Sequence, residues 1–193
     1  MEKIILGLVF MLSVVSFGQE KEFSFTKEKG FTEYVVIDKI GQTDKELYQK
    51  ALGWINETYK NPEKVILAKN DNSYIRIEGM DSNISWMKVM GMTTYYSTKY
   101  EIEFYFKDGK VKFDITSVNT YTEATKYASG GWSKRHYYSM PLDERTSDLI
   151  FKEDGTFRNN YRDIQTNVEY YNGLVKSMDI YLRGEAKSQA SNW

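Results

Sequence analysis

The dipeptide Asp108-Gly109 constrains the fold of this chain most, because it predicts a type I′ β-hairpin and so fixes which residues of two strands face each other. If Lys107 pairs with Lys110, apolar residues fall opposite one another on one face and charged residues alternate with them on the other. Turn chemistry and hydrophobic pattern therefore predict the same register. The predicted apolar pairs are Phe106 with Val111, Phe104 with Phe113, and Ile102 with Ile115.

Further strands are predicted on the N-terminal side of this hairpin. The β-branched run from Tyr34 to about Ile40 is apolar on both faces, which is typical of a strand in the interior of a sheet. Residues 64–70 and 74–80 flank the turn-forming residues 71–73 and predict a second hairpin. Residues 84–92 alternate in character and predict one more strand.

Two amphipathic helices are predicted. Thr43 and Glu46 form a capping box, so the first helix begins there and ends before Asn61-Pro62. Its apolar stripe consists of Leu47, Ala51, Trp54, Ile55 and Thr58. A longer stripe with spacings of three and four runs from Phe157 to Leu182. That stripe suits either a coiled-coil seam or a sheet, and we expect a sheet because aromatic-rich strands need covering.

The order of these elements predicts an α+β fold with one antiparallel sheet of five to six strands and two helices on one face (β-α-β(4)-α). We expect a single domain over residues 31–186, a flexible leader over 19–30 and a frayed tail over 187–193. The chain has no cysteine, so a packed core rather than disulfides must stabilise it.

The first 18 residues have the form of an export signal. Lys3 precedes an apolar run from Ile4 to Val15, and the small residues Ser16 and Gly18 predict cleavage before Gln19. The run is shorter than the roughly 20 apolar residues that span a bilayer, which disfavours the alternative of a retained anchor. We therefore expect an exported protein, periplasmic or secreted, without a membrane span after signal removal.

Composition argues against several classes of function. With 26 basic and 27 acidic residues, the chain has no charge excess that would attract nucleic acid. A single histidine, His136, and no cysteine leave no basis for a metal site, and we expect no cofactor and no catalytic residues. The pairs Asp143-Glu144 and Glu153-Asp154 suit glycoside hydrolysis in principle, but both lie beside turn or cap signals.

Several segments resemble an exported bacterial family. They are Val36-Ile37-Asp38, Lys45-Glu46-Leu47-Tyr48, Ala51-Leu52, Trp54-Ile55, Tyr59-Lys60, Val65-Ile66 and Ile75 to Gly79. Over residues 34–121 the chain resembles the domain of unknown function 4468. The resemblance implies a TBP-like fold, in which one helix crosses over and four strands precede a second helix. This topology by itself implies neither an activity nor DNA binding.

The connection over residues 122–155 is long for a compact domain, and we look for a binding surface there. The candidate contact residues follow a diglycine and combine flat rings with hydrogen-bond donors. They are Trp132, Lys134, Arg135, His136, Tyr137 and Tyr138. In the alternative, these aromatic residues cover the second face of the sheet.

Three classes of function remain open. A non-catalytic module that binds an envelope ligand or protein is favoured, acting as a monomer or weak homo-oligomer. A structural or assembly component of the envelope is the alternative, and a hydrolase is the third class.

Overall fold

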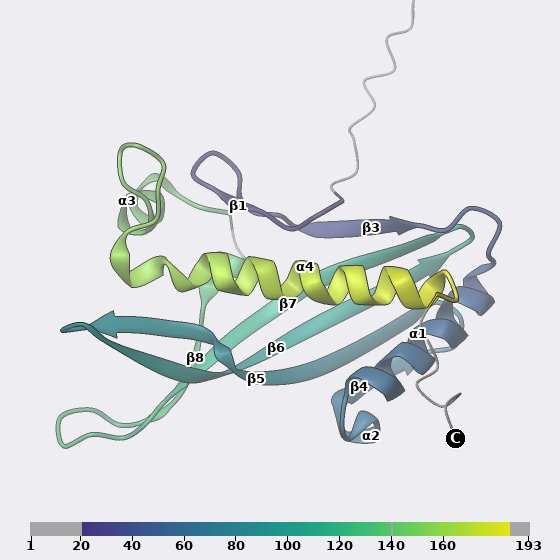
Figure 1. Cartoon of the computed structure of the whole chain (residues 1–193), viewed down its shortest axis with the longest axis horizontal. Coiled ribbons are helices and arrows are strands. Elements are labelled where there is room, and N and C mark those ends of the chain that lie inside the picture. The colour runs from purple at the N-terminus through teal and green to yellow at the C-terminus, as the bar shows by residue number, and fades with distance from the viewer. Residues whose placement is uncertain (1–20, 140, 186–193) are drawn as a thin grey trace, which may run out of the picture.

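A twisted antiparallel sheet runs the length of the molecule in the computed structural model, which describes residues 21–139 and 141–185 (Figure 1). The strand order is β3-β7-β6-β5-β4, and β8 pairs with the far end of β7. The strands are β3 (Tyr34–Asp38), β4 (Ile66–Asn70), β5 (Tyr74–Val89), β6 (Met92–Lys107), β7 (Lys110–Thr122) and β8 (Gly131–Lys134). The helices are α1 (Asp44–Thr58), α2 (Pro62–Val65), α3 (Glu144–Ile150) and α4 (Asp163–Leu182), with 3₁₀ turns η1 (His136–Tyr138) and η2 (Asn159–Tyr161).

The hairpin predicted around Asp108-Gly109 is confirmed in its register. Lys107 lies opposite Lys110, and Gly109 adopts the positive φ of 73° that this turn requires. The predicted apolar pairs face each other and are buried: Phe106 with Val111, Phe104 with Phe113, and Ile102 with Ile115.

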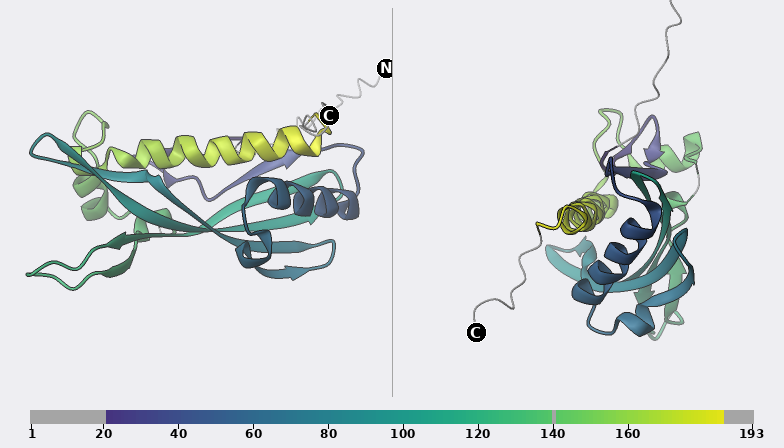
Figure 2. Two further views of the ribbon diagram at one scale, coloured as in Figure 1. Left: turned by 60° about the horizontal axis from the view of Figure 1, so that its bottom comes forward. Right: turned by 90° about the vertical axis from the view of Figure 1, so that its right-hand side faces the viewer.

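Helices α1 and α4 pack on one face of the sheet, as predicted (Figure 2). The ring of Trp54 in α1 lies 6.0 Å from that of Phe104, and the ring of Tyr171 in α4 lies 5.8 Å from that of Tyr100. Phe104 and Tyr100 are both buried on the same face of β6, so the two helices share one core. The stripe of the last helix therefore covers the sheet. No helix in the described residues is long and apolar enough to cross a membrane.

The predicted capping box begins α1. Thr43 accepts a hydrogen bond from the Glu46 backbone, and the Glu46 carboxylate accepts one from the Thr43 backbone at 2.8 Å. The stripe residues of α1 are buried except Thr58, the last residue of the helix. Pro62 begins a second, short helix, α2. Proline suits the first position of a helix, because the N–H that it lacks has no partner within the helix there.

The predicted leader over residues 19–30 is wrong from Phe23 onward. Residues Phe25–Thr26 form β1, which pairs with β2 (Gly30–Phe31), and the Phe23 ring stacks on Phe31 at 5.2 Å. Asn172 of α4 accepts a hydrogen bond from the Phe23 backbone N–H and donates one to its carbonyl. Two phenylalanines of this charged segment, Phe23 and Phe25, are thus part of the core, although the charge pattern indicated a leader.

Two other predictions need correction. The last helix begins at Asp163 rather than Phe157, since Phe157 forms an isolated bridge with Phe151. β3 is an edge strand rather than an interior one, because it pairs with β7 alone.

The strands predicted at 74–80 and 84–92 form one long strand. β5 continues to Val89 with a register shift between Asp81 and Ser85, and Met90 and Gly91 turn into β6. Figure 2 shows this hairpin and the loop between β7 and β8 as two arms at one end of the molecule. The predicted signal and tail lie outside the described residues, as does the last residue of the predicted domain.

Candidate functional site

The structure divides the predicted contact segment between two environments. Trp132 and Lys134 lie on β8, where they pair with Tyr121 and Asn119 of β7 and are exposed. His136 is exposed at the start of η1. The other three predicted residues pack inside the molecule, so the segment is not one continuous surface.

Arg135 is part of a buried polar network. Its guanidinium forms an ion pair with Asp163, the first residue of α4, whose side chain is 1% exposed. The same guanidinium donates to Ser85 Oγ of β5 at 3.3 Å. Asn167 donates to the Ile84 carbonyl at 2.7 Å and extends the network along α4. Arg135 therefore connects the end of β8, β5 and α4.

Tyr137 and Tyr138 contribute aromatic packing. Tyr138 is 4% exposed, and its ring lies 5.0 Å from Phe31. Tyr137 packs edge-on against Phe25 at 5.8 Å, and burial raises the pKa of its phenol. Both rings close the core where β1 and β2 meet η1. The alternative stated from the sequence, that these aromatics cover the second face of the sheet, is wrong for Tyr137 and Tyr138, because both pack in the core on the helix side, where Tyr138 meets Tyr171 of α4.

Trp132 belongs to the sheet face opposite the helices. Its ring lies 5.3 Å from that of Tyr121, and the Lys99 ammonium lies 5.1 Å from its centroid. The Trp132 side chain is 44% exposed, so it remains accessible. A contact role for Trp132, Lys134 and His136 stays a prediction.

Aligned rows of side chains cross this uncovered face. The register places Tyr34 beside Asp114, which lies opposite Glu103, which lies opposite Arg76. The next row consists of Val36, Lys112, Tyr105, Tyr74 and Asn70. Aromatic rings and alternating charges thus occupy the face that the helices leave uncovered.

Glu103 organises the centre of this face. Its carboxylate accepts hydrogen bonds from the Tyr74 hydroxyl at 2.9 Å and the Tyr105 hydroxyl at 2.5 Å. The pKa of Tyr105 rises to about 12, chiefly because its hydroxyl bonds to this carboxylate. The pKa of Tyr74 also rises to about 12, chiefly through burial and then through the same carboxylate. Both rings are therefore fixed in position as neutral donors.

A groove of 510 Å³ opens beside these rings, between β3 and the β6–β7 turn. We call it the lysine groove; it is lined by Tyr34, Val36, Tyr105, Lys107, Lys110 and Lys112. The Lys112 ammonium lies 4.3 Å from the Tyr34 ring centroid and 5.2 Å from that of Tyr105. Three cations around two aromatic rings and a valine suit an anionic group attached to an apolar one.

Two acids lie beside the groove: Asp114, and Asp38, whose carboxylate lies 4.0 Å from the Lys110 ammonium. The Asp114 carboxylate lies 2.8 Å from the Lys112 ammonium. Burial raises the pKa of Asp114, against the opposing influence of Lys112. Lys112 is therefore shared between this partly desolvated acid and the two rings.

Part of this site could be predicted from the sequence. Alternation in the hairpin places Tyr105 and Lys112 on the face away from the core. Tyr34 could not be added, because its position requires knowing that β3 pairs with β7.

One acid of each pair considered for hydrolysis has a structural role. Asp143 is the N-cap of α3 and accepts a hydrogen bond from the Thr146 backbone, which lowers its pKa. Asp154 accepts hydrogen bonds from the Thr156 hydroxyl at 2.6 Å and from the Thr156 backbone at 2.9 Å in a turn, and these bonds lower its pKa. Within residues 21–139 and 141–185, no group of three or more His, Cys, Asp or Glu is placed to hold a metal ion.

Comparison with known proteins supports the fold. The model of the family described as a domain of unknown function (DUF4468) with TBP-like fold matches residues 31–121, which confirms the resemblance inferred from the sequence. A crystal structure of a DUF4468 family protein from Bacteroides ovatus is similar with a TM-score of 0.52 and 12% identity, over 80% of this chain and 84% of that one. A TBP-like protein from Parabacteroides distasonis gives 0.51 and 11%, over 78% and 90%. At these identities the likeness shows the fold alone. No curated protein matches the chain.

Proposed function

For this chain, whose residues 31–121 match the DUF4468 domain with its TBP-like fold, we propose a non-catalytic role as an exported module that binds a ligand or protein of the cell envelope. The lysine groove is the proposed contact site. It would take a partner that combines carboxylate or other anionic groups with apolar surface.

The observation that carries this proposal is the composition of the groove. Helices cover the opposite face, and a solvated sheet face needs only polar side chains. Here Tyr34 and Val36 add apolar surface to three lysines. Tyr105 is 39% exposed although its hydroxyl is held by Glu103, so its ring is presented in a fixed orientation.

A titration followed by NMR tests the site. We expect acidic peptides and anionic oligosaccharides to shift backbone signals of residues 34–36 and 105–112 before those of β8. Lys107→Glu should weaken the binding at least about tenfold, because it reverses an exposed charge beside the groove. Lys64→Glu in α2 is the matched control, since it makes the same charge change away from the groove.

Two results would contradict the proposal. One is equal binding by the parent protein and Lys107→Glu. The other is a set of shifts that excludes the groove and lies on β8 or the helices.

Export is the second part of the proposal. The first buried side chain among the described residues is Phe23, which follows the predicted cleavage site between Gly18 and Gln19, so cleavage there would remove none of the described core. Intact mass of the protein from its own envelope fraction should show a chain that begins at Gln19. A chain that retains residues 1–18 after a carbonate wash of the membranes would contradict export in this form.

An assembly role is the second candidate, and one observation favours it. The tip of the β5–β6 hairpin exposes Met90, Met92 and Tyr95, with 96%, 70% and 57% of each residue accessible. Apolar side chains on a projecting arm suit insertion into a neighbouring protein. Truncation of the arm would abolish assembly in that case and leave the lysine groove intact.

A further inference from the structure

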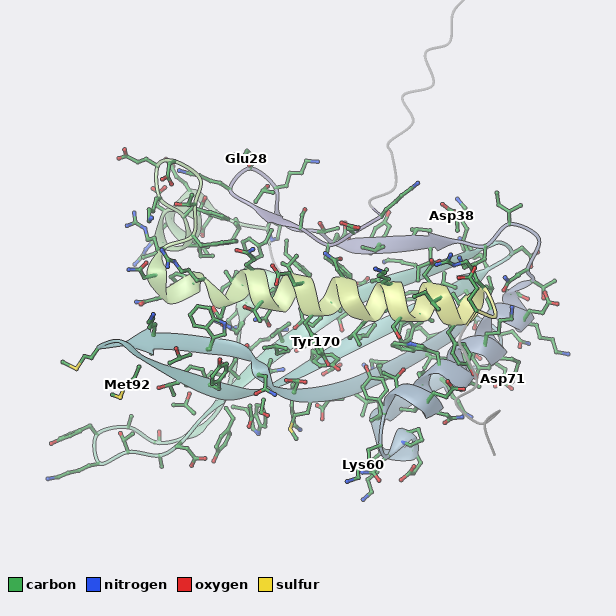
Figure 3. All side chains as sticks on the ribbon, viewed as in Figure 1. Glu28, Asp38, Lys60, Asp71, Met92 and Tyr170 are labelled. Atoms are coloured by element: carbon green, nitrogen blue, oxygen red, sulfur yellow. The ribbon has the colours of Figure 1, made fainter. Side chains whose placement is uncertain are left out.

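β3 combines two properties that do not usually occur together. Its sequence is apolar on both faces, which is typical of a strand with neighbours on both sides, yet it pairs only with β7. Figure 1 shows β3 as the outermost strand of the sheet, and Figure 3 labels Asp38 at its end. Edge strands are commonly protected by lysine, proline or a bulge, and β3 has none of these between Tyr34 and Asp38.

The register shows which backbone groups of β3 point outward. Lys39 N–H donates to the Gly109 carbonyl at 2.7 Å, so residues 39 and 109 are a hydrogen-bonded pair. Such pairs recur at every second position, so the backbone N–H and C=O groups of Val35 and Ile37 point toward β7. The two-residue turn after Lys107 leads to the same assignment. It makes Lys107 and Lys110 a hydrogen-bonded pair, so alternate residues of β7 from Lys110 onward bond to β6 and the residues between them bond to β3. The N–H and C=O groups of Tyr34, Val36 and Asp38 therefore point away from the sheet.

Open space borders this edge on both faces. The lysine groove lies on the uncovered face, and a second groove of 470 Å³ lies on the helix face between β3 and α4. Val36 lines both grooves. The helix-side groove is also lined by Ile37 and Val175, and a Cβ at Gly173 of α4 would meet no atom within 4 Å.

We infer that β3 is a docking edge for an extended acidic peptide segment of a partner protein, which adds to the sheet as a further strand. The inference rests on the proposed function, since it gives the class of ligand that the lysine groove would take. Main-chain bonds to Tyr34, Val36 and Asp38 would supply affinity, and alternate side chains would enter the two grooves.

Charge complementarity determines which side chain enters which groove. Residues of the added strand opposite Val36 share its face and meet Lys107, Lys110 and Lys112, so acidic residues belong there. The residues between them share the face of Val35 and Ile37 and enter the helix-side groove. Ile37 and Val175 form the apolar part of its otherwise largely polar lining, so β-branched residues suit that part. A strand that alternates acidic and β-branched residues satisfies both grooves.

Backbone methylation of a peptide tests this inference without altering the protein. The probe is a short capped peptide of alternating glutamate and valine, measured by calorimetry against the mature chain. N-methylation of one alternate set of its amides should abolish binding, since those amides face β3. Methylation of the other set should leave affinity within about twofold, because those amides face solvent.

Two variants of one position provide the complementary test. Val36→Pro removes the outward N–H, and proline is tolerated on an edge strand where the N–H faces solvent. It should weaken binding of the parent peptide about tenfold while the circular dichroism spectrum stays unchanged. Val36→Thr keeps both the N–H and the shape, and it should bind like the parent.

The outcomes separate this inference from the proposed function. If both methylated peptides bind equally and Lys107→Glu still weakens their binding, the groove binds acidic side chains but no strand is added to β3. If no acidic peptide binds, both fail. A protein that is dimeric at micromolar concentration and becomes monomeric in Val36→Pro would show that a second copy occupies the edge, which overturns a peptide partner.

Discussion

Arg135 is held inside the molecule by an acidic partner, and this limits what residues 131–138 can contact. Its sequence neighbourhood suited a binding loop, since no local pattern shows that Asp163 lies within reach. Trp132, by contrast, is on the solvent side of β8 and touches Tyr121 and Lys99. Neighbouring residues of one segment therefore have different roles, because the chain passes from a strand into a buried turn between them.

Truncation distinguishes these roles. Arg135→Ala should destabilise the protein by about 3 to 5 kcal/mol, because Asp163 remains buried without its partner. Trp132→Ala should cost less than about 1 kcal/mol, the range of one cross-strand pair. Urea denaturation measures both, with the exposed Lys134→Ala as control. Equal losses for Arg135→Ala and Trp132→Ala would contradict the division of this segment.

The tyrosines on the uncovered face give a pH-dependent prediction. Their raised pKa values mean that the folded state holds the phenolic protons more tightly than the unfolded chain. This stabilisation is complete below the ordinary tyrosine pKa of 10.0 and is lost as pH rises toward 12. Glu103→Gln should lower the pKa of Tyr105 more than that of Tyr74, because the bond to Glu103 is the main cause only for Tyr105. An NMR titration that shows equal changes, or a larger one at Tyr74, would contradict this account.

At the scale of elements, turns with their preferred residues were predictable and a turn without them was not. Asp108-Gly109 gave the β6–β7 register correctly. Met90-Gly91 makes an equally tight turn between β5 and β6, yet Met90 has a φ of 50°, a region that asparagine and glycine prefer. The sequence therefore predicted a strand continuing through this turn. The start of α4 was misplaced because Phe157 and Tyr161 continue its spacing outside the helix.

The Met90 turn provides a prediction at this scale. Met90→Asn should stabilise the protein by about 1 kcal/mol, because asparagine tolerates the left-handed conformation better. The measurement is the urea midpoint at constant m-value. Met92→Asn is the control, because it replaces another exposed methionine at a strand position. A stabilisation that is equal in both variants would show that removing exposed methionine, rather than relieving the turn, is the cause.

The whole molecule depends on contacts that join its two ends. The antiparallel sheet, its two long helices and the face that they cover were predictable from periodicity and capping, whereas β1, β2, α2, β8 and α3 were not. The position of β3 at the edge was not, because strand order is a matter of long-range pairing. The role of Phe23 was hidden for the same reason, since its partners Phe113 and Asn172 lie far along the chain.

The N-terminal segment therefore contributes to global stability. Phe23→Ala should cost about 3 to 5 kcal/mol, because it opens a cavity beneath Phe31 and Phe113. Glu22→Ala, one residue earlier and exposed, should leave stability unchanged. Thermal and chemical denaturation check both. A Phe23→Ala variant as stable as the parent protein would show that this segment is a leader and not part of the core.

Residue-resolved amide exchange tests most directly the claim that β3 presents an open, binding-competent edge. In the free protein, we expect fast exchange at Val36 and slow exchange at Val35 and Ile37, whose amides bond to β7. Saturation with the acidic peptide should slow exchange at Val36 and leave Lys112, already paired with Tyr105, unchanged. Slow exchange at Val36 in the free protein, or no change at saturation, would contradict the account.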